Sequence, residues 1–191
     1  ALDVLGKWWS GRREALETVL HAASNEDPDI RRIALDVLGK WWSGRREALE
    51  TVLHAASNED PDIRPTALVT LGERWHDRRE VFDAVLHAAT DKDPDIRRTA
   101  LVTLGERWHD RREVFDAVLH AATGKDAGVR RTALVTLGEW WHDRGEVFDA
   151  VLHAATGKDL GIRRTALVTL GEWWHDRREV FDTFLHAATD D

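Results

Sequence analysis

Apolar residues recur along the chain with the spacing of amphipathic helices, in two alternating patterns. In the first, represented by residues 93–108, Ile96, Leu104 and Trp108 fall on one arc at about 100° per residue, and charged residues occupy the opposite arc. The pattern begins with Asp-Pro, which combines a capping carboxylate with a proline that suits the first helical turn. It predicts an amphipathic helix that starts at the proline.

The second pattern follows a short turn and is represented by residues 77–89. Val81, Phe82 and Val85 share one face, and acidic side chains lie on the other. Asp77 and Glu80 have the spacing of a capping box, in which each side chain accepts a hydrogen bond from the backbone N–H of the other residue. This predicts a second amphipathic helix capped by Asp77.

The two patterns repeat with a period of 33 residues. Each copy opens with Ala-Leu-x-x-Leu-Gly, at positions 1, 34, 67, 100, 133 and 166. Because two short helices cannot bury both apolar faces alone, neighbouring copies must stack around a continuous core. We therefore predict an all-α fold, a right-handed α-solenoid of six 33-residue antiparallel helix pairs, with residues 1–191 forming a single domain and the first pair truncated.

Glycine and proline within the first helix of each pair carry further information. Gly105 and its equivalents lie in mid-helix, where glycine costs about 1 kcal/mol relative to alanine, so we expect a neighbouring helix to approach closely there. One copy has Pro65 four residues after Pro61, where proline removes a backbone hydrogen bond and crowds a carbonyl. We expect a kink or a delayed helix start at Pro65.

The first helix carries the motif Asp-x-x-Ile/Val-Arg-x-x-Ala-x-x-x-Leu-Gly, which resembles the second helix of HEAT-like repeats of the armadillo type. The resemblance covers essentially the whole chain, although Ala127-Gly128 and Leu160-Gly161 replace Pro-Asp in two copies. Ankyrin repeats share the period, but their Thr-Pro and Gly-rich hairpin segments are missing, and the order of the tetratricopeptide signature is inverted here.

The phrase Leu-Gly-x-x-Trp-x-Asp-x-x-x-Val-Phe is similar to HEAT arrays at the sensor end of bacterial NACHT-type signalling ATPases. This resemblance implies a fragment of a larger bacterial signalling protein. The chain itself has no Gly-x-x-x-x-Gly-Lys-Ser/Thr phosphate loop, so it is not the ATPase.

The amino-acid composition of the chain excludes several classes of function. The chain has 27 Lys and Arg against 35 Asp and Glu, a net charge of −8, and no cysteine. Disulfides, thiolate catalysis and cysteine-based zinc sites are therefore excluded. No apolar run approaches the ~20 residues that span a bilayer, and we expect a cytoplasmic protein.

Histidine is the residue type that most suggests a metal site or a catalytic site. One histidine recurs in the second helix of every copy, at His21, His54, His87, His120, His153 and His186. Packed helices lie about 8–10 Å apart, whereas two ligands of one zinc ion each lie about 2 Å from it, so successive histidines cannot share a metal. The His-Asp dyads at 76, 109, 142 and 175 lack a nucleophile and are interpreted as turn residues. We expect no cofactor, no metal and no enzymatic activity.

Two rows of arginines remain. The first stands four residues after the capping aspartate and predicts a structural ladder of ion pairs between copies, made by Asp27, Asp60, Asp93, Asp126, Asp159, Arg31, Arg64, Arg97, Arg130 and Arg163. The second row, such as Arg78-Arg79, begins the second helix. Both rows leave nucleic-acid binding as an alternative, which the net charge opposes.

Tryptophans and variable positions suggest a partner surface. The column of Trp108 lies on the apolar arc, and the preceding column alternates between tryptophan and arginine. The columns of Ile33, Asp36, Val37 and Lys40 differ most between copies and cluster on the exposed side of the first helix, which in HEAT-like solenoids lines the concave surface. The candidate partner-binding surface comprises Asp36, Lys40, Val102, Glu106, Trp41, Arg74, Arg107 and Trp140.

Together these patterns favour a non-catalytic protein-interaction scaffold or sensor array whose partner is a protein or peptide. A pigment-lyase activity, known among HEAT-like proteins, ranks below nucleic-acid binding. Apolar residues such as Val4, Trp8, Val180 and Phe181 lack a following copy to cover them, which also predicts end-to-end self-association.

Overall fold

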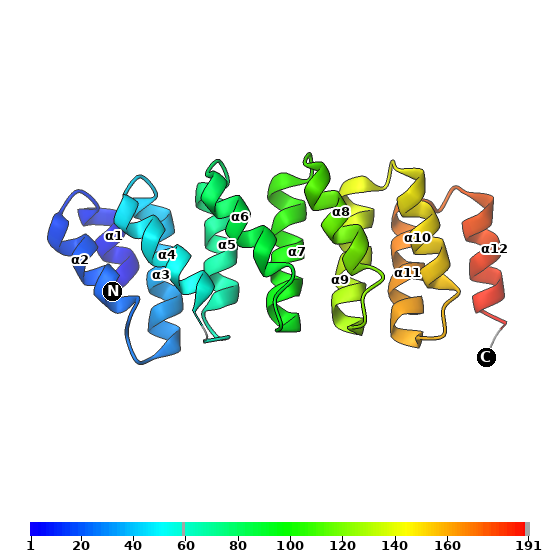
Figure 1. Cartoon of the computed structure of the whole chain (residues 1–191), viewed down its shortest axis with the longest axis horizontal. Coiled ribbons are helices and arrows are strands. Elements are labelled where there is room, and N and C mark those ends of the chain that lie inside the picture. The colour runs from blue at the N-terminus through cyan, green and yellow to red at the C-terminus, as the bar shows by residue number, and fades with distance from the viewer. Residues whose placement is uncertain (59, 190–191) are drawn as a thin grey trace. The chain divides into compact units, whose positions relative to one another are not determined.

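The computed structural model describes residues 1–58 and 60–189, and every regular element within them is an α-helix (Figure 1). The helices are α1 (Leu2–Trp9), α2 (Arg13–Ala22), α3 (Pro28–Trp42), α4 (Arg46–Ser57), α5 (Arg64–Trp75), α6 (Arg79–Ala88), α7 (Pro94–Trp108), α8 (Arg112–Ala121), α9 (Ala127–Trp141), α10 (Gly145–Ala155), α11 (Leu160–Trp173) and α12 (Arg178–Ala187). Each 33-residue copy forms one antiparallel helix pair, which confirms the predicted all-α solenoid of stacked helix pairs.

The chain divides into two compact units, Ala1–Thr103 and Leu104–Asp191, here called unit 1 and unit 2. In unit 1, α1 packs on α3 and α3 on α5, so the odd-numbered helices form one layer, and α2 and α4 cover it. In unit 2, α9 packs on α11, with α8 and α10 against them. The organisation of residues 1–191 as a single domain stays a prediction.

The apolar arcs are buried as the periodicity predicts. Ile96, Leu104 and Trp108 of α7 are buried, and so are Val81 and Phe82 of α6. No described helix is long and apolar enough to cross a membrane.

The predicted capping box at Asp77 is wrong. Helix α6 begins at Arg79, its cap residue is the extended Arg78, and no side chain caps it. The Arg78 N–H donates to the carbonyl of Trp75 at 2.9 Å, which closes a tight turn directly out of α5. This turn keeps Asp77 outside the capping position.

The column of Val37 is also placed wrongly by the sequence, because it is buried rather than exposed. Val37 is 1% exposed, and its equivalents Thr70 and Thr103 are buried. A Cβ added at Gly39 would lie 2.5 Å from the Thr70 Cγ2, and one at Gly138 would lie 2.4 Å from the Thr169 Cγ2. The mid-helix glycines are therefore the positions where the next repeat approaches closely, as expected.

Pro65 delays the start of its helix, as predicted. Helix α5 begins at Arg64, whereas α3 and α7 begin at Pro28 and Pro94, the equivalents of Pro61. Pro65 thereby occupies the first turn of α5, where its missing N–H needs no partner.

We expect Pro65→Arg to extend α5 back to Pro61 and to raise the free energy of unfolding by about 1 kcal/mol, because the new N–H can donate to the carbonyl of residue 61. Amide exchange at positions 65 and 66 should slow, and denaturant titration gives the free energy. Unchanged exchange there would contradict this account of the delayed start.

Candidate functional site

The inner tryptophan column joins each repeat to the one before it through the backbone. The indole Nε1 donates to the turn carbonyl 32 residues earlier in four repeats: Trp42 to Ser10 at 2.7 Å, Trp75 to Ser43 at 2.6 Å, Trp141 to His109 at 2.9 Å and Trp174 to His142 at 2.9 Å. The sequence placed these rings in the core but did not reveal this hydrogen bond. The only signal was that the column never varies.

The outer column, which alternates between tryptophan and arginine, covers the mid-helix glycine of the preceding repeat. A Cβ at Gly6 would lie 2.2 Å from the Trp41 Cδ1, one at Gly39 would lie 2.9 Å from the Arg74 Cγ, and one at Gly105 would lie 2.9 Å from the Trp140 Cδ1. Arg74 is exposed, while Trp41 and Trp140 are half-buried. The column therefore packs on one side and meets solvent on the other.

In unit 1 this column is held by a carboxylate. Asp3 accepts hydrogen bonds from the Trp41 Nε1 and the Lys40 Nζ, each at 3.0 Å. These two bonds, Trp41 first, lower the pKa of Asp3 below its ordinary value against the opposing effect of desolvation. The Lys40 ammonium also lies 5.2 Å from the centre of the Trp41 ring.

In unit 2 the turn histidines hold the same column instead. The His109 ring stacks on Trp140 with centroids 4.6 Å apart, and the His142 ring stacks on Trp173 at 4.4 Å. The Nδ1 atoms of His109 and His142 lie 3.1 Å from the carbonyl oxygens of Gly105 and Gly138. The histidines of two of the His-Asp dyads, His109 and His142, thus pack between repeats.

The other candidate surface residues lie on the odd-numbered helices with their side chains in solvent. Asp36 and Lys40 of α3 are exposed, as are Val102, Glu106 and Arg107 of α7. Valines equivalent to Val102 recur at the surface of α5, α9 and α11, and each has an exposed glutamate one turn later: Val69 with Glu73, Val135 with Glu139 and Val168 with Glu172. Each unit therefore presents a row of exposed valines flanked by acidic side chains.

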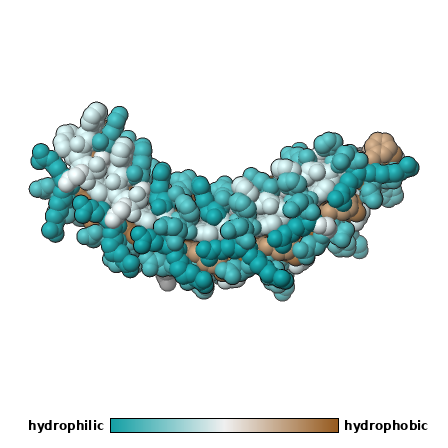
Figure 2. All heavy atoms as spheres, turned by 90° about the horizontal axis from the view of Figure 1, so that it is seen from above, coloured by the Kyte–Doolittle hydropathy of each residue, from teal (hydrophilic) through white to brown (hydrophobic). Residues whose placement is uncertain are grey.

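Most of the remaining surface is polar. Seen from above, hydrophobic atoms emerge only in small patches among hydrophilic ones (Figure 2). At the α12 end, Phe181, Phe184 and Leu185 are exposed, whereas Val180 is buried, contrary to expectation. End-to-end self-association stays a prediction.

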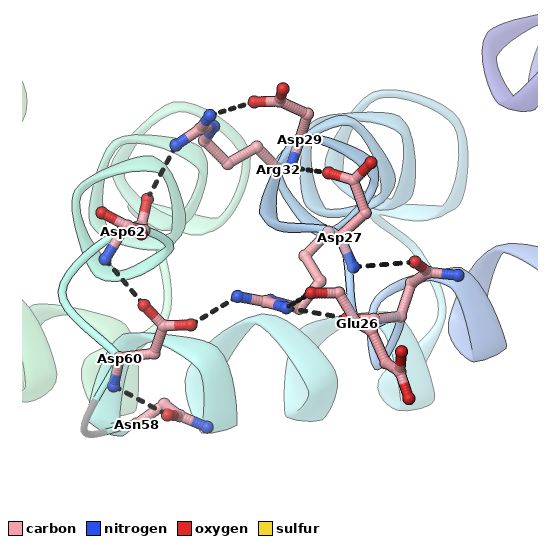
Figure 3. A network of polar contacts seen from close by, with 9 residues as sticks. Glu26, Asp27, Asp29, Arg32, Asn58, Asp60 and Asp62 are labelled. Atoms are coloured by element: carbon pink, nitrogen blue, oxygen red, sulfur yellow. Dashed lines mark hydrogen bonds and ion pairs between the residues drawn. The ribbon is translucent and has the colours of Figure 1, made fainter.

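The first arginine row contacts carboxylates across the repeat junctions of unit 1. Arg31 pairs with Asp60, whose backbone N–H in turn donates to Asn58 (Figure 3). Arg64 pairs with Asp91 at 2.5 Å, not with Asp93, which follows two residues later. Both arginine side chains are largely buried, so these are partly desolvated ion pairs.

The aspartates of the predicted ladder also accept hydrogen bonds from nearby backbone N–H groups, at the start of a helix in every case but Asp60, which lies before the delayed start of α5. The carboxylates of Asp27, Asp60 and Asp93 each accept from the backbone N–H two residues on. Those of Asp126 and Asp159 accept from the N–H three residues on. A local backbone hydrogen bond therefore occupies one carboxylate oxygen of each aspartate.

The later arginines of the first row are not paired in the way that Arg31 and Arg64 are. Arg97 donates to the carbonyls of Asp91 and Lys92 at 2.6 and 2.9 Å. Within the described residues, Arg130 and Arg163 make no ion pair, and the Arg130 Nε is buried without a hydrogen-bond partner.

The pairing of Arg64 with Asp91 predicts a pH dependence. The hydrogen bond from Arg64 holds the pKa of Asp91 below its ordinary value of 3.8, against the opposing effect of burial. Because the folded pKa is depressed, the pair stabilises unit 1 fully above pH 3.8 and is lost as pH falls through the lower folded value.

We expect Asp91→Asn to lower the free energy of unfolding by about 2 kcal/mol at pH 7 and by progressively less below pH 3.8. Asparagine retains the local turn, because Asn58 accepts the equivalent backbone hydrogen bond. Denaturant titrations from pH 7 to pH 3 measure the difference. Asp83→Asn, which removes an exposed pair with Arg79, is the control and should cost far less.

In the second arginine row, the second arginine of each pair contacts a carboxylate of its own helix. Arg13, Arg46, Arg79, Arg112 and Arg178 each lie 2.7–3.6 Å from a carboxylate one turn later. The six histidines of the second helices are exposed. Among residues 1–58 and 60–189, no group of three or more His, Asp or Glu side chains is placed to hold a metal ion.

Comparisons agree with this architecture. A family model described as HEAT repeats matches residues 1–72 and 49–137. No curated protein sequence matches the chain.

Three solved structures share the fold. A chain from the structure of the Pds5–Scc1 complex, described in relation to cohesin function, has a TM-score of 0.69 and 16% identity over 97% of this chain and 37% of its own. YibA of Escherichia coli has a TM-score of 0.65 and 16% identity over 92% and 65%. A chain from the CpcE–CpcF complex of the phycocyanin lyase of Nostoc has a TM-score of 0.60 and 17% identity over 83% and 99%.

The present chain thus spans about a third and about two thirds of the first two of these chains. At such identities the likeness concerns the fold alone. The family match and the repeated Asp-Arg, glycine and tryptophan contacts agree, and the chain belongs to the HEAT repeat family.

Proposed function

We propose that the chain is a non-catalytic scaffold that binds a protein partner through the exposed side of its odd-numbered helices, here called the odd-helix face. In unit 1 this face includes Asp36, Lys40 and Val69, and in unit 2 it includes Val135 and Val168. The proposal includes the candidate surface deduced from the sequence. It also includes the origin of the chain in a larger bacterial signalling protein.

The main support for the proposal is the row of exposed valines. Val135 is 45% exposed and Val168 is 53% exposed, although buried apolar positions surround them in the same helices. Helices α9 and α11 pack directly on each other, so the two valines stand on neighbouring helices, about 8–10 Å apart at the axes. Apolar groups in a row with charged neighbours fit a peptide segment that inserts its own apolar side chains.

Two structures with this fold contain protein complexes, Pds5–Scc1 and CpcE–CpcF, which supports a role in protein binding. A nucleic-acid ligand is less well supported. The second arginine of each pair in the second row contacts a carboxylate, and two arginines of the first row do so as well.

Selection of random peptides on immobilised chain tests the proposal. Selected peptides should bind the wild type and should lose about tenfold in affinity for a Val135→Ser, Val168→Ser double variant, because each serine removes apolar contact area. A Glu146→Gln, Asp149→Asn variant of α10 is the matched control and should bind normally. Equal loss in both variants, or selection of no peptide, would contradict the proposal.

A further inference from the structure

Unit 2 carries an edge of unpaired cations where unit 1 has ion pairs. The residues are Lys125, Arg130, Arg131, Lys158, Arg163 and Arg164, here called the cationic edge, and none of them makes an ion pair with another described residue. They belong to the turns before α9 and α11 and to the first turns of these helices.

Two kinds of substitution remove carboxylates that pair with arginines in unit 1. Where unit 1 has Asp91, the turn before α11 has Gly157. Gly128 and Gly161 replace the aspartates that pair with Arg32 and Arg98 in the earlier repeats. Acidic groups are thus removed from turns that keep their arginines.

Arg130 lacks the carboxylate that its equivalents Arg31 and Arg64 hold. Arg64 pairs with Asp91, 27 residues later, and the residue 27 positions after Arg130 is Gly157, which has no side chain. Asp159 lies 29 residues after Arg130, the spacing of Arg31 and Asp60, but one of its oxygens caps α11 by accepting from the Ile162 N–H at 2.9 Å, and it makes no ion pair with Arg130. The buried Nε of Arg130 is left without a partner.

Together with Arg130, the neighbouring cations form a positively charged surface. The Arg131 guanidinium lies against the first turn of α11, because its Nη1 is 3.4 Å from the place of a Cβ on Gly161. One repeat later, Arg163 lines a cavity of about 440 Å³ with Thr156, Asp182 and His186. The partial positive charges at the starts of α9 and α11 add to the attraction for anions.

We infer that the cationic edge binds carboxylates of an acidic segment in the protein partner. The inference rests on the proposed scaffold function and adds the chemical class of the partner. It commits to carboxylate because this arginine column already holds the carboxylates of Asp60 and Asp91 in unit 1. Arg131 and Arg164 stand one repeat apart and Arg130 adjoins Arg131, so an acidic stretch reaches all three.

A fluorescein-labelled oligoglutamate peptide, titrated by anisotropy at low ionic strength, tests the inference. The wild type should bind it, and Gly157→Asp should weaken binding about tenfold by supplying an internal carboxylate to Arg130. Aspartate is tolerated at this position, since Asp91 occupies it in unit 1. Arg130→Gln should weaken binding similarly.

Gly145→Asp is the matched control, because it adds the same charge at the start of α10, where a Cβ meets nothing within 4 Å. Its affinity should stay within about twofold of the wild type. Circular dichroism of every variant establishes that the helices are intact.

Absence of oligoglutamate binding, or equal weakening by Gly157→Asp and Gly145→Asp, would overturn the inference. Binding of oligothymidylate as tight as that of the peptide, with the same dependence on Arg130, would also overturn it and assign the edge to phosphates. Oligoglutamate binding should persist in the Val135→Ser, Val168→Ser variant. Failure of the cationic edge is therefore distinguishable from failure of the odd-helix face.

Discussion

Trp141→Ala is expected to lower the free energy of unfolding by about 4 kcal/mol, as truncations of buried aromatic residues do. The Trp141 ring is buried, contacts Phe115 edge-on with centroids 5.5 Å apart, and donates its Nε1 hydrogen to the His109 carbonyl at 2.9 Å. Its loss leaves a cavity between two repeats and an unpaired carbonyl. Denaturant titration followed by circular dichroism measures the effect.

Trp9→Ala is the matched control for this prediction. Trp9 belongs to the same column but is 44% exposed at the first repeat. The substitution should cost a small fraction of the loss at Trp141, since little apolar area leaves contact with the protein. Similar losses at the two positions would show that junction packing does not stabilise the repeats.

Gly138→Val is expected to lower the free energy of unfolding by about 3 kcal/mol through overpacking. Even the Cβ would lie 2.4 Å from the Thr169 Cγ2 and 3.0 Å from the Trp173 Cδ1. Both contacts come from α11, so α9 and α11 would have to move apart.

Gly145→Ala provides the comparison for Gly138→Val. A Cβ at Gly145 meets nothing within 4 Å, and alanine favours the helix, so the same titration should show unchanged or slightly higher stability. A stable Gly138→Val protein with intact helices would contradict the close approach of α9 and α11.

Much of the repeat structure, including the close approach between repeats, could be predicted from the sequence. The 33-residue period, the helix that starts at Pro94 and the delayed start at Pro65 each depend on local backbone chemistry or on side-chain periodicity. The close approach at Gly105 was predictable for the same reason, since glycine in mid-helix is costly unless a neighbour requires it.

Contacts between repeats could not be predicted, because they depend on which atoms face each other across a junction. The exchange of Val37 for Thr103 suggested an exposed position, yet both side chains are buried, and the equivalent Thr70 lies beside Gly39. The choice of Asp91 rather than Asp93 by Arg64 depends on the path of the turn. The capping box at Asp77 failed because a tight turn from α5 shifts the helix start.

For the candidate site, too, positions along one helix could be predicted from the sequence, whereas contacts between repeats could not. The sequence identified the exposed positions of α3 and α7, which local periodicity determines. It did not show that His109 and His142 pack on the outer tryptophans, nor that Arg130 lacks the carboxylate that Arg31 and Arg64 hold. Ring stacking and missing ion pairs are properties of three-dimensional neighbours.

Amide hydrogen exchange of the chain, with and without a peptide selected from the random library, tests the scaffold function most directly. The peptide should slow amide exchange in α9 and α11 around Val135 and Val168 and should leave amide exchange on the exposed side of α10 unchanged. Slowed exchange confined to α8, α10 or α12, with none in α9 and α11, would contradict it.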